Sequence, residues 1–300
     1  MPERPPPSGN SPYRGPPAAP RDKRTRERDR SEQGARDTQP PRREALVETT
    51  ARADDAPPRE QRLYGLNACL AVFAKRPESI RKVWLLDIRI PKFKAVLEFC
   101  VKNRVGYTVV GDDDLEKLSG STHHEGVCFA VLPAPEISLS AWLRDLPAGP
   151  TTALWLDGVG NPHNFGAILR SAAHFGVAGV LLPKDSELSL SGAAARIAEG
   201  GAEQVPMLRL GRSDNAVAQL QSAGFTLAAT VVRGGSALYS TQLPERLVLV
   251  IGAEQLGVTE ELARAATLRL AIPGSGRVES LNVAAATAVF LGEWWRQKKR

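Results

Sequence analysis

The feature that most constrains the fold of this chain is a regular alternation, over residues 151–300, between short apolar runs and segments with helical spacing. The apolar runs are typical of strands and lie at residues 154–156, 179–182, 226–231, 246–251 and 268–271. Helices fit between them, and the last helix is expected over about residues 282–299. Strands that alternate with helices form a mostly parallel sheet covered on both faces. The alternation therefore predicts an α/β domain that binds its ligands at the carboxyl ends of the strands.

A shorter alternation of the same kind precedes this region and predicts a small α/β sandwich over residues 61–133. Helices are expected at residues 65–73, 93–100 and from 112, and strands at 83–86, 107–110 and 127–131. Residues 134–150 are rich in proline and are expected to form a linker with one short helix at 139–146.

Residues 1–60 have a different composition from the rest. They hold 12 of the 23 prolines and 13 of the 39 Lys and Arg residues, with few large apolar side chains. Such a segment cannot bury enough apolar surface to offset the entropy of ordering it, so it is expected to be a disordered arm. The mixed charges at 21–30 favour two roles equally, a solvated tail or a basic tether for phosphate.

Composition also excludes several classes of protein. No apolar run approaches the ~18 residues of a membrane span, and no apolar core of a secretory signal is present near residue 1. The cysteines Cys69, Cys100 and Cys128 are odd in number and widely spaced, which predicts reduced thiols in a cytoplasmic protein. His123 and His124 have no other ligand at a suitable spacing, so no metal site is expected. A net charge of +6 is compatible with a polyanionic partner but too mild to indicate one.

The chemistry-bearing residues lie in three loops that follow apolar strands, at residues 157–170, 252–257 and 272–283. None of these loops carries the GxGxxG or GxxxxGK[ST] pattern, which argues against a classical dinucleotide site and against an NTPase. Glycines at successive strand ends permit the close backbone approach that an adenosine pocket needs, although each glycine alone is compatible with a tight turn.

These loops resemble the three motifs of the SpoU/TrmH class of RNA ribose methyltransferases, within the SPOUT superfamily. The matching segments are, in order, Asn164-x-Gly166-x-x-x-Arg170, Gly252-Ala253-Glu254-x-x-Gly257 and Ile272-Pro273 followed by Ser280-Leu281-Asn282-Val283. Residues 64–132 resemble the small substrate-binding domain that precedes this catalytic domain, through Gly65-x-Asn67-Ala68 and His124-Glu125-Gly126-Val127. The resemblance covers about residues 61–296 and leaves the arm outside.

The resemblance implies an α/β fold with a C-terminal trefoil knot, a cytoplasmic homodimer that forms through the C-terminal domain, and S-adenosylmethionine as methyl donor. The implied reaction is 2′-O-ribose methylation of structured RNA. Ribosomal RNA is favoured because an accessory domain precedes the catalytic one. The alternatives are a tRNA ribose methyltransferase, a non-catalytic RNA-binding protein of the same fold, and a base methyltransferase of the superfamily.

The resemblance also assigns site residues. The implied catalytic residues are Asn164, Arg170, Glu254, Ser280 and Asn282. The implied donor-binding residues are Thr230, Ile251, Gly252, Gly257, Ile272 and Leu281.

Structural roles compete with these assignments at several positions. Asn164, Glu254 and Ser280 each have a spacing that suits a helix cap, and Arg170 suits a solvated helix face. If Arg170 is functional, it takes the 2′-proton or clamps a neighbouring phosphate, and the second role is easier for a guanidinium that stays protonated. Glu199 departs from the family's usual Ser-Ala-Gly-Ala pattern and is expected to affect which RNA is accepted.

Overall fold

The structure is a computed structural model that describes residues 59–211, 213–254 and 256–298. The arm expected at 1–60 therefore lies outside the described residues, except for its last two positions. In the described part no helix is both long and apolar enough to cross a membrane.

The first sheet has four strands in the order β1-β4-β2-β3, with β4 antiparallel to both neighbours and β2 parallel to β3. Its strands are β1 (Gln61–Tyr64), β2 (Ile80–Leu85), β3 (Gly106–Val109) and β4 (Val127–Val131). The helices around it are α1 (Leu66–Lys75), α2 (Lys94–Asn103) and α3 (Asp112–Ser119), with short 3-10 turns η1 (Pro77–Ser79) and η2 (Asp87–Arg89). Apolar side chains of α1 and α2 cover one face, where Leu63, Val83 and Phe129 are fully buried.

The second sheet has seven strands in the order β7-β6-β5-β10-β8-β11-β9, and every pairing in the described part of it is parallel. Its strands are β5 (Thr151–Asp157), β6 (Val180–Leu182), β7 (Met207–Arg209), β8 (Thr226–Thr230), β9 (Ser236–Ala237), β10 (Arg246–Gly252) and β11 (Leu268–Ala271). The helices are α4 (Leu139–Asp145), α5 (Pro162–His174), α6 (Gly192–Ala198), α7 (Ser213–Ser222), α8 (Glu260–Ala265) and α9 (Val283–Lys298), with 3-10 turns η3 (Gly201–Glu203) and η4 (Leu238–Ser240).

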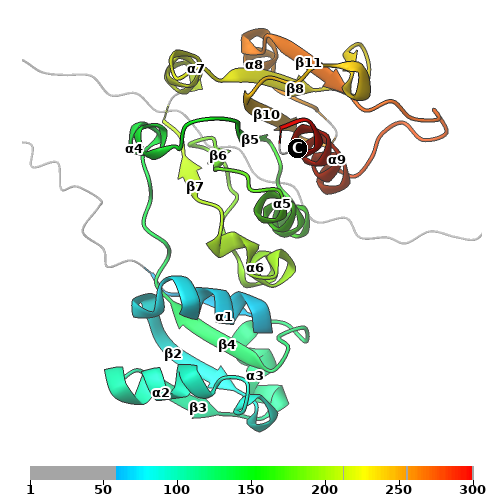
Figure 1. Ribbon diagram of the computed structural model, residues 1–300. Helices are drawn as coiled ribbons and strands as arrows, with labels where there is room; N and C mark the ends of the chain where they lie inside the picture. The colour runs from blue at the N-terminus through cyan, green and yellow to red at the C-terminus, as the bar shows by residue number, and fades with distance from the viewer. Residues whose placement is uncertain (1–58, 212, 255, 299–300) are drawn as a thin grey trace, which may run out of the picture. The chain divides into compact units, whose positions relative to one another are not determined.

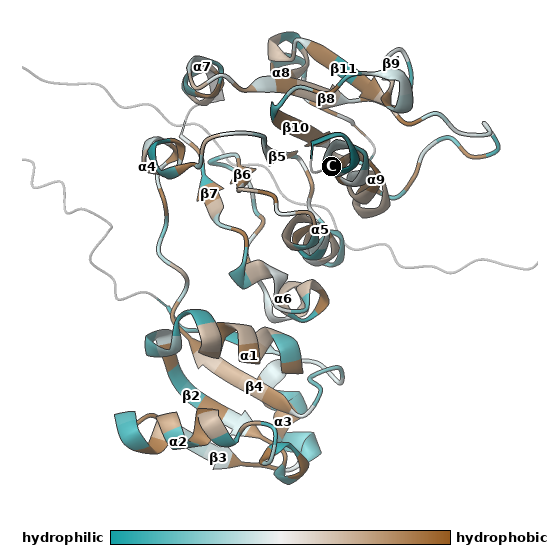
Figure 2. Cartoon of the chain, viewed as in Figure 1, coloured by the Kyte–Doolittle hydropathy of each residue, from teal (hydrophilic) through white to brown (hydrophobic). Residues whose placement is uncertain are grey.

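Helices cover both faces of this sheet, as the alternation predicts (Figure 1). Leu154 and Leu156 of β5 point to the face packed by α5, α6 and α9, whereas Ala153 and Trp155 point to the face packed by α4, α7 and α8. All seven β5 residues are buried. The apolar colouring of β4 and β10 in Figure 2 reflects the same burial, because a strand covered on two faces is apolar throughout.

A buried ion pair joins the end of α1 to η3. The Arg76 guanidinium donates from Nε and Nη2 to the two Glu203 carboxylate oxygens, each at 2.8 Å, and both side chains are less than a tenth exposed. Arg76 also donates to Ser79 Oγ and to the Leu132 carbonyl. This bidentate geometry, with its remaining donors satisfied, is what a buried charge pair requires.

Two further polar contacts join residues around the first sheet to α6 and the residue that follows it. Arg196 Nε of α6 donates to Glu125 Oε1 at 3.0 Å, and Asn67 Nδ2 donates to Glu199 Oε2 at 2.6 Å. Gly192 permits the close packing, since a Cβ there would lie 2.4 Å from the Tyr64 ring. The acid at Glu199 thus holds a side chain of α1.

The expected strands and helices are confirmed with small shifts of their ends, and the 268–271 strand matches β11. The expected linker helix is α4, capped by Ser138, whose side chain accepts from Ala141 N–H. The sequence prediction lacked β1, β7 and β9, which are short strands of two to four residues.

Candidate active site

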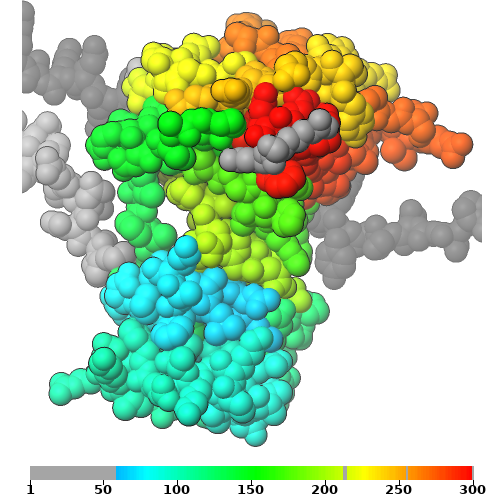
Figure 3. Space-filling view, viewed as in Figure 1, coloured from blue at the N-terminus to red at the C-terminus, as the bar shows by residue number. Residues whose placement is uncertain are grey.

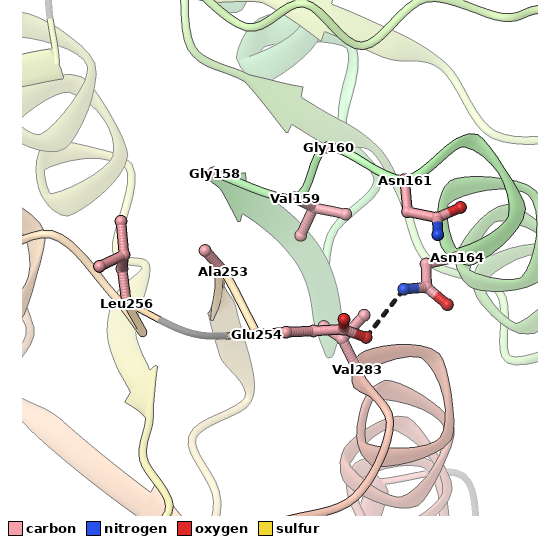
Figure 4. Close-up of a pocket in the computed structure, with 9 residues that line it drawn as sticks. All are labelled: Gly158, Val159, Gly160, Asn161, Asn164, Ala253, Glu254, Leu256 and Val283. Carbon is pink, nitrogen blue, oxygen red and sulfur yellow. Dashed lines mark hydrogen bonds between the residues drawn. The ribbon is translucent and has the colours of Figure 1, made fainter. Parts of the chain in front are cut away.

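A pocket of about 250 Å³ opens at the carboxyl ends of β5 and β10. These strands are neighbours in the centre of the second sheet, and the chain leaves β5 toward β6 on the opposite side from β10. Such a reversal of strand order leaves a crevice in which α/β sheets bind their ligands. The pocket is lined by Gly158, Val159, Gly160, Asn161, Asn164, Ala253, Glu254, Leu256 and Val283 (Figure 4).

Three side chains meet beside this pocket and form what we call the polar cluster: Asn164 in the first turn of α5, Glu254 in the loop after β10 and Asn282 directly before α9. Asn164 Nδ2 donates to Glu254 Oε1 at 2.9 Å, as the dashed line in Figure 4 marks. Asn282 Nδ2 donates to Asn164 Oδ1 at 3.0 Å and to Glu254 Oε1 at 3.3 Å. Each motif of the sequence therefore contributes one member to a connected network.

The helix caps in the structure are not the residues that the sequence suggested. Asn161 rather than Asn164 caps α5, because its side chain accepts from His163 N–H at 2.8 Å. Asn282 Oδ1 accepts from the backbone N–H of Ala284 and Ala285 at the start of α9. The prediction that Ser280 caps this helix is wrong, because the helix begins two residues later than Ser280 would require.

Glu254 does not cap the next helix either, since α8 begins at Glu260 after Thr259. The backbone of Thr259 instead donates to Asp157 Oδ2 at 2.6 Å. Asp157 is 6% exposed and pairs in register with Gly252. Sequence reasoning missed this anchor, although a carboxylate directly after a continuous apolar strand could have indicated it.

The loop after β10 is closed on itself at its glycines. Ala253 and Gly257 exchange two backbone hydrogen bonds of 3.0 and 2.9 Å. A Cβ at Gly252 would lie 2.2 Å from the Gly257 carbonyl carbon, and Gly257 has a φ of +70° that favours glycine. Both glycines are thus required by the backbone path that presents Glu254.

The predicted donor-binding residues lie at one edge of the sheet. Thr230 ends β8, Ile251 and Gly252 end β10, and Ile272 follows β11, and these three strands are adjacent. Thr230 Oγ1 donates to the Val250 carbonyl at 3.0 Å. Leu281 lies in the loop before α9 and is 48% exposed.

Arg170 and Ser280 are not part of the polar cluster. Both are exposed, and in the described part of the chain no hydrogen bond joins either of them to its members. Arg170 instead lines a second cleft of about 550 Å³ with Asn67, His174, Glu199 and Gln204 among its neighbours. Within one chain the structure therefore brings together three of the five predicted catalytic residues, and the catalytic role of all five stays a prediction.

No group of three or more His, Cys, Asp or Glu residues is placed to hold a metal ion in the described ranges.

Comparison with known proteins gives further evidence about the family of this chain. The family model of the SpoU rRNA methylase family matches residues 151–292, and that of the RNA 2′-O ribose methyltransferase substrate-binding domain matches residues 62–136. A 23S rRNA (guanosine-2′-O-)-methyltransferase from Nitrosomonas europaea is 32% identical over 79% of this chain and 92% of its own length. The chain belongs to the SpoU rRNA methylase family.

Other SpoU relatives agree. An uncharacterised tRNA/rRNA methyltransferase from Escherichia coli is 42% identical over 80% of this chain and 69% of its own length. A solved AdoMet-bound rRNA methyltransferase from Sinorhizobium meliloti has the same fold, with a TM-score of 0.67 at 24% identity over 79% of this chain and 87% of that one. The SpoU family is one of RNA methyltransferase enzymes, and the α/β fold with its mostly parallel sheet is the one that the motifs implied.

Proposed function

We propose that this chain transfers a methyl group from S-adenosylmethionine to a ribose 2′-hydroxyl of structured RNA, and that the RNA is ribosomal. The observation that carries the proposal is the polar cluster, in which Asn164, Glu254 and Asn282 converge at the strand switch point beside a pocket. The rRNA methyltransferase from Nitrosomonas europaea, which matches over nearly its whole length, supports the choice of substrate.

The sheet edge beside the cluster suits the adenosine part of this donor. The loops that follow β8, β10 and β11 expose apolar side chains, namely Val232 at 54%, Leu256 at 89%, Val278 at 71% and Leu281 at 48%. An apolar rim beside open glycine backbone is what a flat purine requires. Thr230, Ile251, Gly252, Gly257, Ile272 and Leu281 would hold the donor, which supplies an already activated methyl group.

The chain's own task is then to position the ribose oxygen and manage its proton. Glu254 accepts from two amides and keeps a second carboxylate oxygen, Oε2, for which no hydrogen bond is found within the described chain. That oxygen is suited to accept a hydroxyl proton or to orient the ribose. The amides of Asn164 and Asn282 fix the carboxylate, so a near-attack geometry supplies much of the rate.

Arg170 is proposed to clamp the phosphate next to the target ribose, because a guanidinium binds phosphate in a bidentate manner and stays protonated. Its separation from the polar cluster favours this role over that of a proton acceptor. Ser280, exposed in the loop before α9, is proposed to contact the RNA or the donor.

The test is methyl transfer from labelled S-adenosylmethionine to purified rRNA and, separately, to tRNA. We expect alkali-resistant labelling of rRNA, and we expect Arg170→Lys, which keeps the charge but loses the fork, to reduce it nearly to background. Arg144→Lys on α4 is the matched control and should keep full activity. Labelling of tRNA alone would favour the tRNA alternative, and donor binding with no transfer to either RNA would favour a non-catalytic RNA-binding protein.

Four finer features of the family are also proposed for this chain. They are the C-terminal trefoil knot, a cytoplasmic location, homodimer formation through the C-terminal domain, and a division into domains at 61–133 and 151–300 joined by a linker at 134–150.

The dimer seam is proposed on α9, which forms part of the surface in Figure 3 (red) and carries Trp295 at 46% exposure. Sedimentation at micromolar concentration should show a dimer, and a monomer would contradict the seam.

A further inference from the structure

The face of the first sheet opposite α1 and α2 carries an unusual group of side chains. Side chains alternate between the two faces of a strand, so Arg62, Lys82 and Trp84 point away from the core that holds Leu63 and Val83. Arg62 of β1 and Lys82 of β2 both pair in register with Ala130 of β4 and so lie on either side of it, and Trp84 lies two residues after Lys82 on β2. The three side chains therefore share one surface, which we call the Trp84 face.

The two cations both lie against the Trp84 ring. The Arg62 Cζ atom is 5.4 Å from the ring centroid, and the Lys82 Nζ atom is 5.2 Å from it. Arg62 is anchored because its Nη1 donates to the Leu118 carbonyl at the end of α3, at 2.6 Å. Lys82 has no such anchor in the described structure, and its flexible stem can leave the ring at little cost.

The cover of this face is incomplete. Leu115 of α3 packs on Tyr64 and Cys128, and Trp84 lies at the margin of that small cluster. Trp84 is half-buried, whereas Arg62, Lys82 and the neighbouring Thr108 of β3 are exposed. Helix α3 thus packs over β1 and β4, and part of the Trp84 ring on β2 remains accessible at the sheet surface.

The charge on the Trp84 face is unbalanced. Among residues 59–298 as described, neither Arg62 nor Lys82 forms an ion pair with a carboxylate, although eight other Lys and Arg side chains do. Two unpaired positive charges beside an aromatic ring match the chemistry of an unpaired nucleotide, which offers a flat base and a negative phosphate on each side.

We propose that the Trp84 face binds an unpaired nucleotide of the RNA substrate, with its base stacked on Trp84 and its flanking phosphates paired with Arg62 and Lys82. The occupant is single-stranded, because bases within a duplex are stacked on one another and cannot reach a side chain at a sheet surface. This inference rests on the proposed function, and it locates RNA on the first sheet, away from the polar cluster.

The experiment measures binding of a 12-nucleotide single-stranded RNA to the full chain by fluorescence anisotropy, without any methyl donor. We expect Trp84→Ala to weaken binding by about tenfold or more, and Trp84→Phe to restore most of it, since stacking needs only an aromatic face. Lys82→Ala should lower the slope of log K against log salt by about one, whereas Trp84→Ala should leave that slope unchanged. Lys94→Ala on α2, whose exposed side chain pairs with Glu98 across 3.9 Å, is the matched control and should change neither quantity.

The outcomes separate the possibilities. Unchanged affinity in Trp84→Ala and Lys82→Ala, with intact circular dichroism, would mean that the two cations only pack on the ring. Equal losses for a 12-base-pair duplex, or displacement by an acidic peptide as readily as by RNA, would also overturn the proposal. The binding assay contains no methyl donor, so it is independent of methyl transfer. If the unmodified chain transfers no methyl group to rRNA but still binds the RNA in a Trp84-dependent manner, the proposed function is refuted and this inference stands.

Discussion

At the scale of single residues, Asn282 has two structural tasks that use opposite ends of its amide. Its Oδ1 caps α9, and its Nδ2 holds Asn164 and Glu254 in place. The motif alone identified Asn282 as a site residue, but which atom does what depends on the exact start of α9. Helix boundaries are the part of a fold that local sequence determines least, which is why the cap was misassigned to Ser280.

The two tasks of Asn282 can be separated by two substitutions. Asn282→Ala loses the cap and the cluster, so we expect a stability loss of about 1–2 kcal/mol together with loss of methyl transfer. Asn282→Asp keeps a capping oxygen but places a second carboxylate beside Glu254, so it should retain near-normal thermal stability while losing activity. Urea unfolding measures the stability and methyl-transfer rates measure the activity; an Asn282→Asp variant that keeps both would show that Asn282 serves only as a cap.

The buried thiols give a prediction about pH. Burial raises the pKa of Cys69 well above its usual value, and it raises the pKa of Cys128 to about 11. In the unfolded chain these thiols ionise near pH 9, so stability is fully present below pH 9 and is lost as pH rises toward 11. Unfolding free energy should therefore fall between pH 8.5 and 10.5, and Cys128→Ser should flatten part of this decline. Native protein at pH 8 should react slowly with a thiol reagent.

At the scale of elements, the loop after β10 is determined by two backbone contacts rather than by its side chains. The three motif loops could be located from the sequence, because each follows an apolar strand and contains glycine. The close contact that makes Gly252 necessary could not be predicted from the sequence, because it depends on how residues 253–257 fold back on the end of β10.

Gly252→Ala should force this loop open. Its Cβ would meet backbone atoms of Gly257 and Val258 at 2.2–2.5 Å, which flexible side chains cannot relieve. We expect a clear drop in melting temperature and weaker donor binding, because Glu254 and the neighbouring backbone move together. Gly211→Ala, where no heavy atom lies within 4 Å of the added Cβ, is the control for stability. Calorimetry with and without S-adenosylmethionine measures both effects, and an unchanged melting temperature would contradict the close contact.

At the scale of the whole molecule, strand order and long-range pairs are the parts that the sequence could not specify. The alternation of strands and helices predicted a parallel sheet, but not that β10 lies between β5 and β8. Glu199 is expected from the sequence to influence the RNA accepted, and in the structure its carboxylate accepts a hydrogen bond from Asn67, while the nearby Glu203 pairs with Arg76. Partners 127 and 132 residues apart cannot be paired from spacing alone.

The Arg76–Glu203 pair should contribute strongly to the stability of the folded chain. Arg76→Ala leaves a buried carboxylate without its partner, and we expect a loss of about 3–5 kcal/mol. Arg76→Met combined with Glu203→Leu removes both charges and should recover much of that loss. A double-mutant cycle by urea unfolding measures the coupling. The exposed pair Lys94–Glu98 is the control, with an expected coupling below about 1 kcal/mol.

The central place of β10 has a consequence for how the chain is made. Residues 246–252 fill the gap between β5 and β8, both of which leave the ribosome earlier. Until that segment emerges, one edge of β5 is unpaired, and both edges of β8 are unpaired because its other neighbour, β11, is made later still. Such edges invite pairing with other chains, so synthesis that pauses shortly before residue 246 should produce an aggregation-prone intermediate that chaperones bind.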